Sequence, residues 1–356
     1  MNMYQFIKVN LINIRKNFLK IKSLLNLNKT ICAAVVKSDA YGLGLSQVTS
    51  TLCQLGCQDF WVTNLEEAYI IKKISHISRI YIFQGINNLH ELQIVHKNNF
   101  IPVISSQEML AIINRYSSYK INVVLNFDTG IGRDGIQNEE IKNLNLQNCN
   151  VLYVMSHLAC SEQINHLLNK EQLMSVLNLK KNFPALKFTL ANSGGIFLGN
   201  QYHFSMVRPG GALYGVESSE YQKSKMFNVI ELYSSVLIRK IFYKSQNIGY
   251  NASYTVQKGD KVFIITMGYF YGYKRIWGNQ SFVYAKGYFL PVIGNISMNM
   301  LVVNANQLPE SLFNTIELVE LIGNNISLKK VAKLACTDQR EILTSISTRC
   351  RKIYMQ

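Results

Sequence analysis

Short apolar runs alternate with amphipathic stretches through the first two thirds of this 356-residue chain, and this alternation strongly limits its possible folds. Eight runs are predicted as strands, each followed by a helical or turn segment. Such an alternation favours a parallel α/β arrangement. Eight units in roughly 230 residues fit a (β/α)8 TIM-type barrel, and a doubly wound sheet is the alternative by pattern alone. The predicted strands are 31–36, 59–63, 80–83, 101–104, 121–127, 150–155, 187–190 and 205–207.

The rhythm changes after about residue 228, where strand-like runs follow one another with few helical intervals. We therefore expect two domains: an N-terminal barrel over residues 1–228 and a mainly β domain over residues 229–356. The strands expected in the second domain are 234–243, 261–267, 281–285, 289–292 and 300–303, with helices near 327–336 and 338–346.

The composition is that of a globular protein, with 48% hydrophobic and 16% charged residues. The net charge of +16 suggests nucleic-acid binding, but the basic residues are scattered and form no recognisable nucleic-acid-binding module. We therefore expect no nucleic-acid partner. A basic surface also attracts anionic cofactors and substrates.

Seven cysteines are present, and their spacing matches no zinc site, so we expect no metal and reduced thiols in a cytoplasmic protein. The N-terminal segment lacks the apolar core of a signal peptide. The apolar stretch 262–273 is too short to span a bilayer, so no membrane association is expected.

Lys37 ends the apolar run 32–36 and precedes a turn with two glycines. Burying an ammonium group at the end of a strand costs free energy, so a lysine in this position points to a functional role. Desolvation there lowers an ammonium pKa and leaves a nucleophilic amine that can condense with a carbonyl group. A lysine whose side chain extends from the strand end into solvent, without a functional role, explains the pattern about as well.

Further polar side chains and glycine pairs follow the predicted strands, where a parallel barrel places its ligand site. Backbone N–H groups at two glycine pairs can hold a phosphate, and barrel phosphate sites usually follow strands seven and eight. Either pair alone also fits an ordinary turn. The residues at this end are Lys37, Tyr41, Arg133, His157, Asn192, Ser193, Arg208, Gly210 and Gly211.

The segment AVVKSDAYGLG, which contains Lys37, resembles the cofactor-lysine signature of the alanine racemases, a family of pyridoxal phosphate (PLP) enzymes with a barrel fold. Later segments resemble other motifs of that family, in the same order, along nearly the whole chain. They are ANSGG at 191–195, VRPGGALYG at 207–215, IGYNASYT at 248–255, MGYFYGYKR at 267–275 and GNISMNM at 294–300.

The resemblance implies that Lys37 carries PLP, that Ser193 holds its phosphate and that Arg208, oriented by His157, faces the pyridine nitrogen. An arginine stays protonated, so that nitrogen should stay unprotonated. The ring is then a weaker electron sink, which favours clean proton exchange at Cα over side reactions. The implied cofactor contacts are Lys37, Tyr41, His157, Asn192, Ser193, Arg208, Gly210 and Gly211.

Racemisation needs two opposed bases, and the resemblance implies Lys37 on one face and Tyr250 on the other. In this family the tyrosine reaches the cofactor of the partner subunit, which implies a head-to-tail homodimer with two shared active sites. A phenol is a weak base, so cationic neighbours are needed. Arg133 and the backbone N–H of Met298 match groups that contact the substrate carboxylate, and Tyr269 matches a residue of the entrance channel.

Several positions depart from the family's common pattern. Asn126 stands where the family often has a carbamylated lysine, whose negative charge faces the arginine that matches Arg133. An inorganic anion such as chloride is the expected substitute, since a buried, unpaired arginine is costly. The other departures lie near the entrance or the phosphate and leave both bases in place: Leu43, Tyr271, Asn295, Asn299 and Arg340.

The expected activity is therefore interconversion of L-alanine and D-alanine, which supplies D-alanine for peptidoglycan. A racemase for serine, lysine or a broader range of amino acids is the alternative, because the entrance is altered. A decarboxylase of similar fold is disfavoured, since this sequence lacks the phosphate-loop motif of those enzymes. A non-enzymatic PLP-binding protein would lack the β domain that follows residue 228.

Overall fold

The computed structural model describes residues 4–219 and 225–356, which fall into two compact units. One unit comprises Ile14–Ala40 and Gly44–Phe227, and the other comprises Met1–Asn13, Tyr41–Leu43 and Asn228–Gln356. The first strand of the chain therefore belongs to the second unit, whereas the sequence analysis placed it with the barrel.

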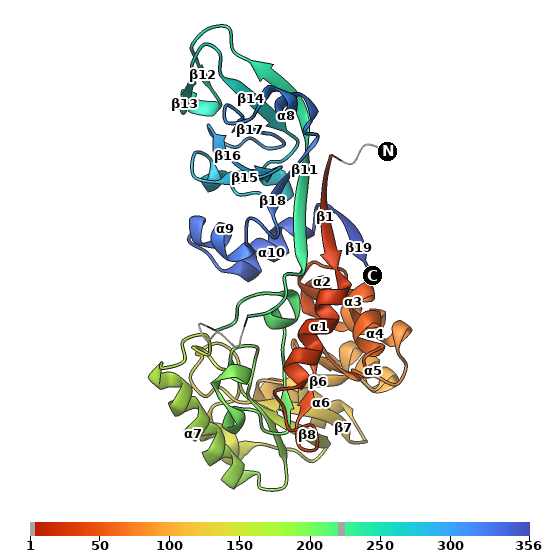
Figure 1. Ribbon diagram of the computed structural model, residues 1–356. Coiled ribbons are helices and arrows are strands. Elements are labelled where there is room, and N and C mark those ends of the chain that lie inside the picture. The colour runs from red at the N-terminus through yellow and green to blue at the C-terminus, as the bar shows by residue number, and fades with distance from the viewer. Residues whose placement is uncertain (1–3, 220–224) are drawn as a thin grey trace. The chain divides into compact units, whose positions relative to one another are not determined.

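The larger unit is a closed barrel of parallel strands (Figure 1). Its first strand is interrupted at Ala33, and the two halves pair with different neighbours, β10 on one side and β4 on the other. The sheet order β2-β10-β9-β8-β7-β6-β5-β4-β3 thus begins and ends in one extended segment. This confirms the predicted barrel and excludes the doubly wound sheet. The strands are β2 (Ile31–Cys32), β3 (Ala34–Val35), β4 (Asp59–Val62), β5 (Arg79–Ile82), β6 (Ile101–Ile104), β7 (Ile121–Asn126), β8 (Cys149–Met155), β9 (Lys187–Thr189) and β10 (Met206–Val207).

Helices follow the barrel strands and begin at polar caps. The side chains of Asn64, Asn88 and Ser106 each accept a hydrogen bond from the backbone N–H three residues later, which satisfies a donor that the first turn leaves unpaired. β4 and β6 are buried at every position, as expected for parallel strands covered on both faces. The helices of this part of the chain are α1 (Leu11–Lys22), α2 (Lys37–Tyr41), α3 (Leu45–Cys53), α4 (Leu65–Ile74), α5 (Leu89–Asn98), α6 (Gln107–Tyr116) and α7 (Leu167–Asn182).

The second unit is built on an eight-stranded sheet in the order β14-β17-β16-β15-β18-β11-β1-β19. The long strand β11 pairs with both β14 and β18, and the two chain ends meet as the parallel pair β1–β19. A separate hairpin joins β12 to β13. The strands are β1 (Gln5–Asn10), β11 (Ile230–Ile241), β12 (Gln246–Ile248), β13 (Tyr254–Val256), β14 (Lys261–Ile265), β15 (Phe282–Ala285), β16 (Tyr288–Ile293), β17 (Leu301–Asn304), β18 (Leu318–Ile322) and β19 (Arg351–Met355), with helices α8 (Glu310–Thr315), α9 (Leu328–Leu334) and α10 (Gln339–Ser347).

Candidate active site

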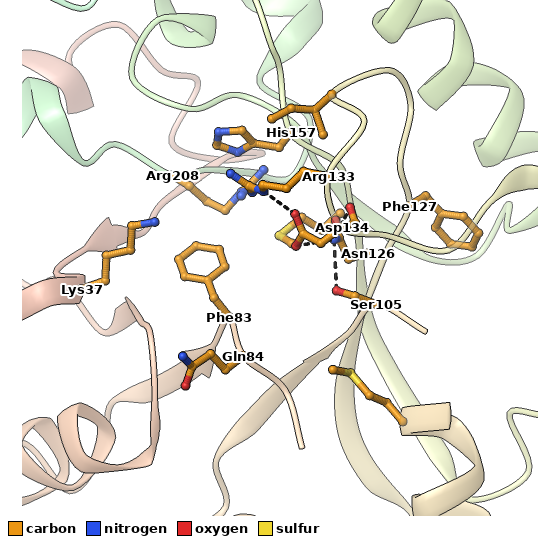
Figure 2. A pocket seen from close by; sticks show the side chains of 13 residues that line it. Lys37, Phe83, Gln84, Ser105, Asn126, Phe127, Arg133, Asp134, His157 and Arg208 are labelled. Atoms are coloured by element: carbon orange, nitrogen blue, oxygen red, sulfur yellow. Dashed lines mark hydrogen bonds and ion pairs between the residues drawn. The ribbon is translucent and has the colours of Figure 1, made fainter. Parts of the chain in front are cut away.

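A cavity of about 380 Å³ opens at the carboxyl ends of the barrel strands (Figure 2). Four residues singled out from the sequence line it together: Lys37 after β3, Arg133 after β7, His157 after β8 and Arg208 after β10. This is the end of a parallel barrel at which ligand sites form. The other lining residues are Phe83, Gln84, Ser105, Met109, Asn126, Phe127, Ile131, Asp134 and Met155.

The backbone turns in a left-handed sense directly after Lys37. Residues 38–41 all have φ between 53° and 58°, a conformation that costs about 1–2 kcal/mol for each residue with a side chain. Glu67 at the start of α4 holds this turn, since its carboxylate accepts the N–H of Asp39 (3.0 Å) and that of Thr63 (2.8 Å). The Asp39 carboxylate in turn accepts the N–H of Leu45 at 2.7 Å. These bonds fix the backbone that carries the Lys37 amine.

Glu67→Ala is therefore expected to lower the free energy of unfolding by about 1–2 kcal/mol, because two backbone donors lose their acceptor, Asp39 in the strained turn and Thr63 just before α4. Urea unfolding followed by circular dichroism measures this change. Glu66→Ala is the matched control, since Glu66 is the exposed neighbour on the same helix, and it should change stability by less than about 0.5 kcal/mol. Equal losses in the two variants would contradict the role of Glu67.

The Lys37 amine lies in a positively charged surrounding. Its Nζ is 5.2 Å from the ring centroid of Phe83, and the side chain is half-buried. Burial lowers the pKa of Lys37, and the charges of Arg133 and Arg208 lower it further, while Asp134 and Glu67 oppose the shift. The amine is thus more readily deprotonated than an ordinary lysine, as a nucleophile or a base requires.

Arg208 is almost fully buried, with 2% of its surface exposed. Its Nε donates to the Thr189 hydroxyl at 3.0 Å, and one Nη donates to the carbonyl oxygens of Ser156 and Leu190. Burial lowers the pKa of Arg208 to about 9, so the guanidinium stays charged at neutral pH. His157 lines the same cavity, with its Nε2 3.5 Å from the amide nitrogen of Asn192.

The ANSGG segment forms a tight loop around Ser193. The Ser193 hydroxyl oxygen accepts the N–H groups of Gly210 and Ala212 at 3.0 and 3.1 Å, so the two glycine-rich segments after β9 and β10 are joined there. Asn192 braces the loop by accepting the N–H of Gly195 at 2.9 Å. A side chain at residue 194 would place its Cβ 2.5 Å from the Ser161 hydroxyl. Ser193 and the Gly210–Gly211 backbone thus lie together, and their binding of a phosphate stays a prediction.

Arg133 projects from the loop between β7 and its continuation at Ile136. Its Nε donates to the carboxylate of Asp134 at 2.6 Å, and its side chain is 65% exposed. The sequence analysis expected a buried Arg133 with an inorganic anion beside it. In the structure this guanidinium is paired with the carboxylate of the next residue in the chain, and the anion beside it stays a prediction.

The predicted residues of the second unit lie on three connected loops. Tyr250, 61% exposed, follows β12, and its carbonyl accepts the amide of Asn295 at 2.8 Å. Tyr269 donates its N–H to the carbonyl of Ser297 at 3.2 Å, next to the half-exposed Met298. These loops approach so closely at Gly268 that a Cβ there would lie 2.3 Å from two carbonyl oxygens.

Tyr41 groups with the second unit and is half-buried. Burial raises the pKa of the Tyr41 hydroxyl, and the positive charge of Arg340 partly offsets that effect. A neutral hydroxyl can donate a hydrogen bond to an anion, as the predicted contact with a phosphate requires.

Three residues of this region escaped the sequence analysis: Phe83, Asp134 and Glu67. The Phe83 ring, after β5, faces Lys37, after β3, because both strands flank β4 in the folded barrel, so its position could be found only from the topology. Asp134 directly follows Arg133, and this pair of opposite charges was a signal in the sequence. Glu67 occupies the third position of a capped helix, a common place for glutamate.

Across residues 4–219 and 225–356, no three His, Cys, Asp or Glu side chains gather in a way that can hold a metal ion, and all seven cysteines are free thiols. In the same part of the chain, every helix is too short or too polar to cross a membrane.

Comparisons with known proteins agree with this architecture. Residues 9–218 match the family model of the alanine racemase N-terminal domain, and residues 229–354 match that of the C-terminal domain. An alanine racemase of Rickettsia canadensis is 33% identical over 97% of this chain and 98% of its own length. A catabolic alanine racemase of Agrobacterium fabrum is 32% identical over 96% of this chain and 90% of its own length.

Solved structures give the same result. The crystal structure of alanine racemase from Bartonella henselae with covalently bound pyridoxal phosphate superposes with a TM-score of 0.92, at 30% identity over 99% of this chain and all of that one. The biosynthetic alanine racemase from Pseudomonas aeruginosa superposes with a TM-score of 0.90, at 26% identity over the whole of both chains. The chain therefore belongs to the alanine racemase family.

Proposed function

We propose that this protein is a PLP-dependent racemase that interconverts L-alanine and D-alanine with two bases, Lys37 and Tyr250. The observation that carries the proposal is the Lys37 amine, half-buried at the end of a barrel strand and grouped with Arg133 and Arg208 in one cavity. A readily deprotonated lysine can bind an aldehyde and act as a base, as this reaction requires. The shared sequence with named alanine racemases supports alanine as the substrate.

The residues present fit PLP by their chemistry. An aldehyde needs an amine such as Lys37, and a phosphate needs backbone N–H and hydroxyl donors such as those of the Ser193 loop. The buried guanidinium of Arg208 suits a ring nitrogen that accepts a hydrogen bond, because arginine donates and does not accept. PLP, when bound, supplies the electron-withdrawing group that makes the Cα–H bond of an amino acid acidic.

Two bases divide the proton transfer between the faces of Cα. The Lys37 amine takes or returns the proton on one side, and its lowered pKa favours the free amine that this step requires. The phenolic oxygen of Tyr250 serves the opposite side. The guanidinium of Arg275 lies over the Tyr250 ring, 5.8 Å from its centroid, which is within cation–π range.

The substrate carboxylate is assigned to Arg133 and to the backbone N–H of Met298, with Tyr269 beside the route by which substrate enters. The planar guanidinium of Arg133 suits a carboxylate, which it can bind through two parallel N–H bonds. His157 is assigned the role of orienting Arg208, with which it shares the cavity.

We propose that two copies form a head-to-tail homodimer in which Tyr250 serves the Lys37 site of the partner subunit. Exposed apolar side chains near Tyr250 support this assembly, since soluble monomers seldom leave such surfaces uncovered. They lie on the connected loops described above and are Tyr250, Tyr269, Phe270, Ile276, Met298 and Met300. We place the enzyme in the cytoplasm, which suits its seven free thiols, and assign its product to peptidoglycan synthesis.

The test is to purify the chain with PLP and to measure D-alanine formed from L-alanine with D-amino-acid oxidase. We expect rapid conversion of alanine and at least about tenfold lower kcat/KM for L-serine and L-lysine, since added polar atoms need partners in the site. A preference for serine or lysine would establish the alternative substrate range. Bound PLP without racemisation of any amino acid would contradict the proposal.

A further inference from the structure

The cavity around Lys37 contains three positively charged side chains and one carboxylate. Lys37, Arg133 and Arg208 supply the positive charges, and Asp134 supplies the negative one among the described residues that line the cavity (Figure 2). The negative charge of Asp134 opposes the lowering of the pKa of both Lys37 and Arg208. Asp134 is thus the acidic group that acts on both cations, while Glu67 acts on Lys37 alone, and the contacts of Asp134 fix the position of its charge.

Asp134 is fixed from two sides. One carboxylate oxygen accepts the Nε–H of Arg133 at 2.6 Å, and the other accepts the amide of Asn126 at 3.2 Å. The same amide nitrogen lies 3.2 Å from the main-chain oxygen of Asp134 and 3.1 Å from the Ser105 hydroxyl. Asn126 is 3% exposed at the end of β7, so a buried group of the barrel anchors the Asp134 carboxylate. An exposed ion pair alone is weakly ordered, whereas this one has a rigid attachment.

The backbone that carries the pair is also rigid. The Asp128 carboxylate accepts the N–H groups of three successive loop residues, Gly130, Ile131 and Gly132, at 2.8 to 3.2 Å. Ile136 returns to pair with the main chain of Asn126 and Asp128. Gly135 has φ of +136°, and a Cβ there would lie 2.4 Å from the Asp128 nitrogen, so the loop accepts no bulkier residue. With the loop backbone fixed, the conformational freedom left at this position is that of the Arg133 side chain.

Arg133 contacts Asp134 through Nε, which leaves the two Nη groups at the far edge of the guanidinium. Among residues 4–219 and 225–356, Asp134 is the acidic residue that forms a salt bridge with Arg133. The Nη edge carries parallel N–H donors that match both oxygens of a carboxylate. An arginine held by Nε therefore presents its bidentate edge to a ligand.

We propose that Asp134 is a positioning residue: held by Asn126, its carboxylate fixes the Arg133 guanidinium so that the Nη edge binds the carboxylate of the amino-acid substrate. The inference rests on the proposed function, which assigns the substrate carboxylate to Arg133. It also replaces the expected chloride ion, because a carboxylate of the chain itself faces Arg133.

The test is a double-mutant cycle on the PLP-loaded enzyme with Arg133→Ala, Asp134→Ala and the double variant. Asp134→Ala should raise the KM for alanine about tenfold and change kcat by less than about threefold, since it disturbs binding more than chemistry. If Asp134 acts through Arg133, the double variant should have the KM of Arg133→Ala and lose nothing more. Glu310→Ala, which breaks the exposed pair with Lys261, is the matched control and should leave KM unchanged.

Acetate supplies a second readout that does not depend on turnover. Its dissociation constant, followed through the visible absorbance of the bound PLP, should rise about tenfold in Asp134→Ala and be unchanged in Glu310→Ala. Asn126→Ala should weaken acetate binding in the same direction, because Asp134 loses its anchor. Replacing chloride by gluconate at constant ionic strength should leave the wild-type KM unaltered.

The outcomes distinguish a failure of the positioning role of Asp134 from a failure of the assigned role of Arg133. A normal KM and normal acetate binding in Asp134→Ala, beside a raised KM in Arg133→Ala, would overturn the positioning role and leave the proposed function standing. A KM in the double variant that is raised by the product of the two single-variant effects would also overturn the positioning role. Normal binding in Arg133→Ala would remove the assignment of Arg133 to the substrate, and with it the inference.

Discussion

Lys37→Ala is expected to abolish racemisation and to leave the fold intact. The amine is both the attachment point proposed for PLP and one of the two proposed bases, so its loss should lower kcat by at least about 10⁴-fold, the upper end of what a single acid–base group contributes. The half-buried side chain ends a strand whose apolar residues remain, so the barrel should still form. The measurements are D-alanine production and the visible absorbance that PLP acquires when a lysine amine binds it.

Two further variants make this result interpretable. Lys37→Arg keeps the positive charge but lacks a free amine, and it should be as inactive as Lys37→Ala. Lys73→Ala removes an exposed lysine of α4 and should retain wild-type activity and absorbance. Residual activity above about a hundredth of wild type in Lys37→Ala would contradict the assignment of this lysine.

Tyr250→Phe is expected to lower kcat/KM by about 10²- to 10⁴-fold, because the phenol is the base on the opposite face of Cα. The two enantiomers are equally stable, so the loss must be the same in both directions. The distinguishing measurement is exchange of the α-hydrogen in deuterated water. D-alanine should still exchange through Lys37 without inversion, whereas L-alanine, whose proton is assigned to Tyr250, should not.

Tyr243→Phe is the matched control, since Tyr243 is 87% exposed in the same unit and has no assigned role. It should racemise both enantiomers at the wild-type rate. Normal racemisation by Tyr250→Phe, or equal retention of exchange for both enantiomers, would show that a different group acts on the second face.

The barrel was predictable because its strands are buried on both faces. The run 101–104 is continuously apolar and coincides with β6, and the mostly apolar run 121–127, interrupted by Asn122 and Asn126, covers β7. The first strand of the chain, β1, was not predictable, since six residues near an end give a weak pattern and its partner β11 lies more than 200 residues away. The terminal strand β19 is one residue shorter, and its sequence RKIYM begins with two charged residues.

Within the site, residues with distinctive chemistry were predictable and residues that act through geometry were not. Lys37 and Arg208 stand out because charged side chains at the ends of apolar strands are uncommon. Glu67 was not predictable, because its task is to hold a left-handed turn that appears only in the folded backbone. Asp134 was hidden for a similar reason, as its second partner, Asn126, lies eight residues away across a loop.

The central claim is that each active site joins Lys37 of one subunit to Tyr250 of the other. Its most direct test is a heterodimer of Lys37→Ala and Tyr250→Phe subunits, isolated by two different affinity tags. Each parent homodimer should be inactive, whereas the heterodimer has one intact site of two and should show about half of the wild-type activity. A heterodimer as inactive as its parents would place both bases in the same subunit and contradict the account.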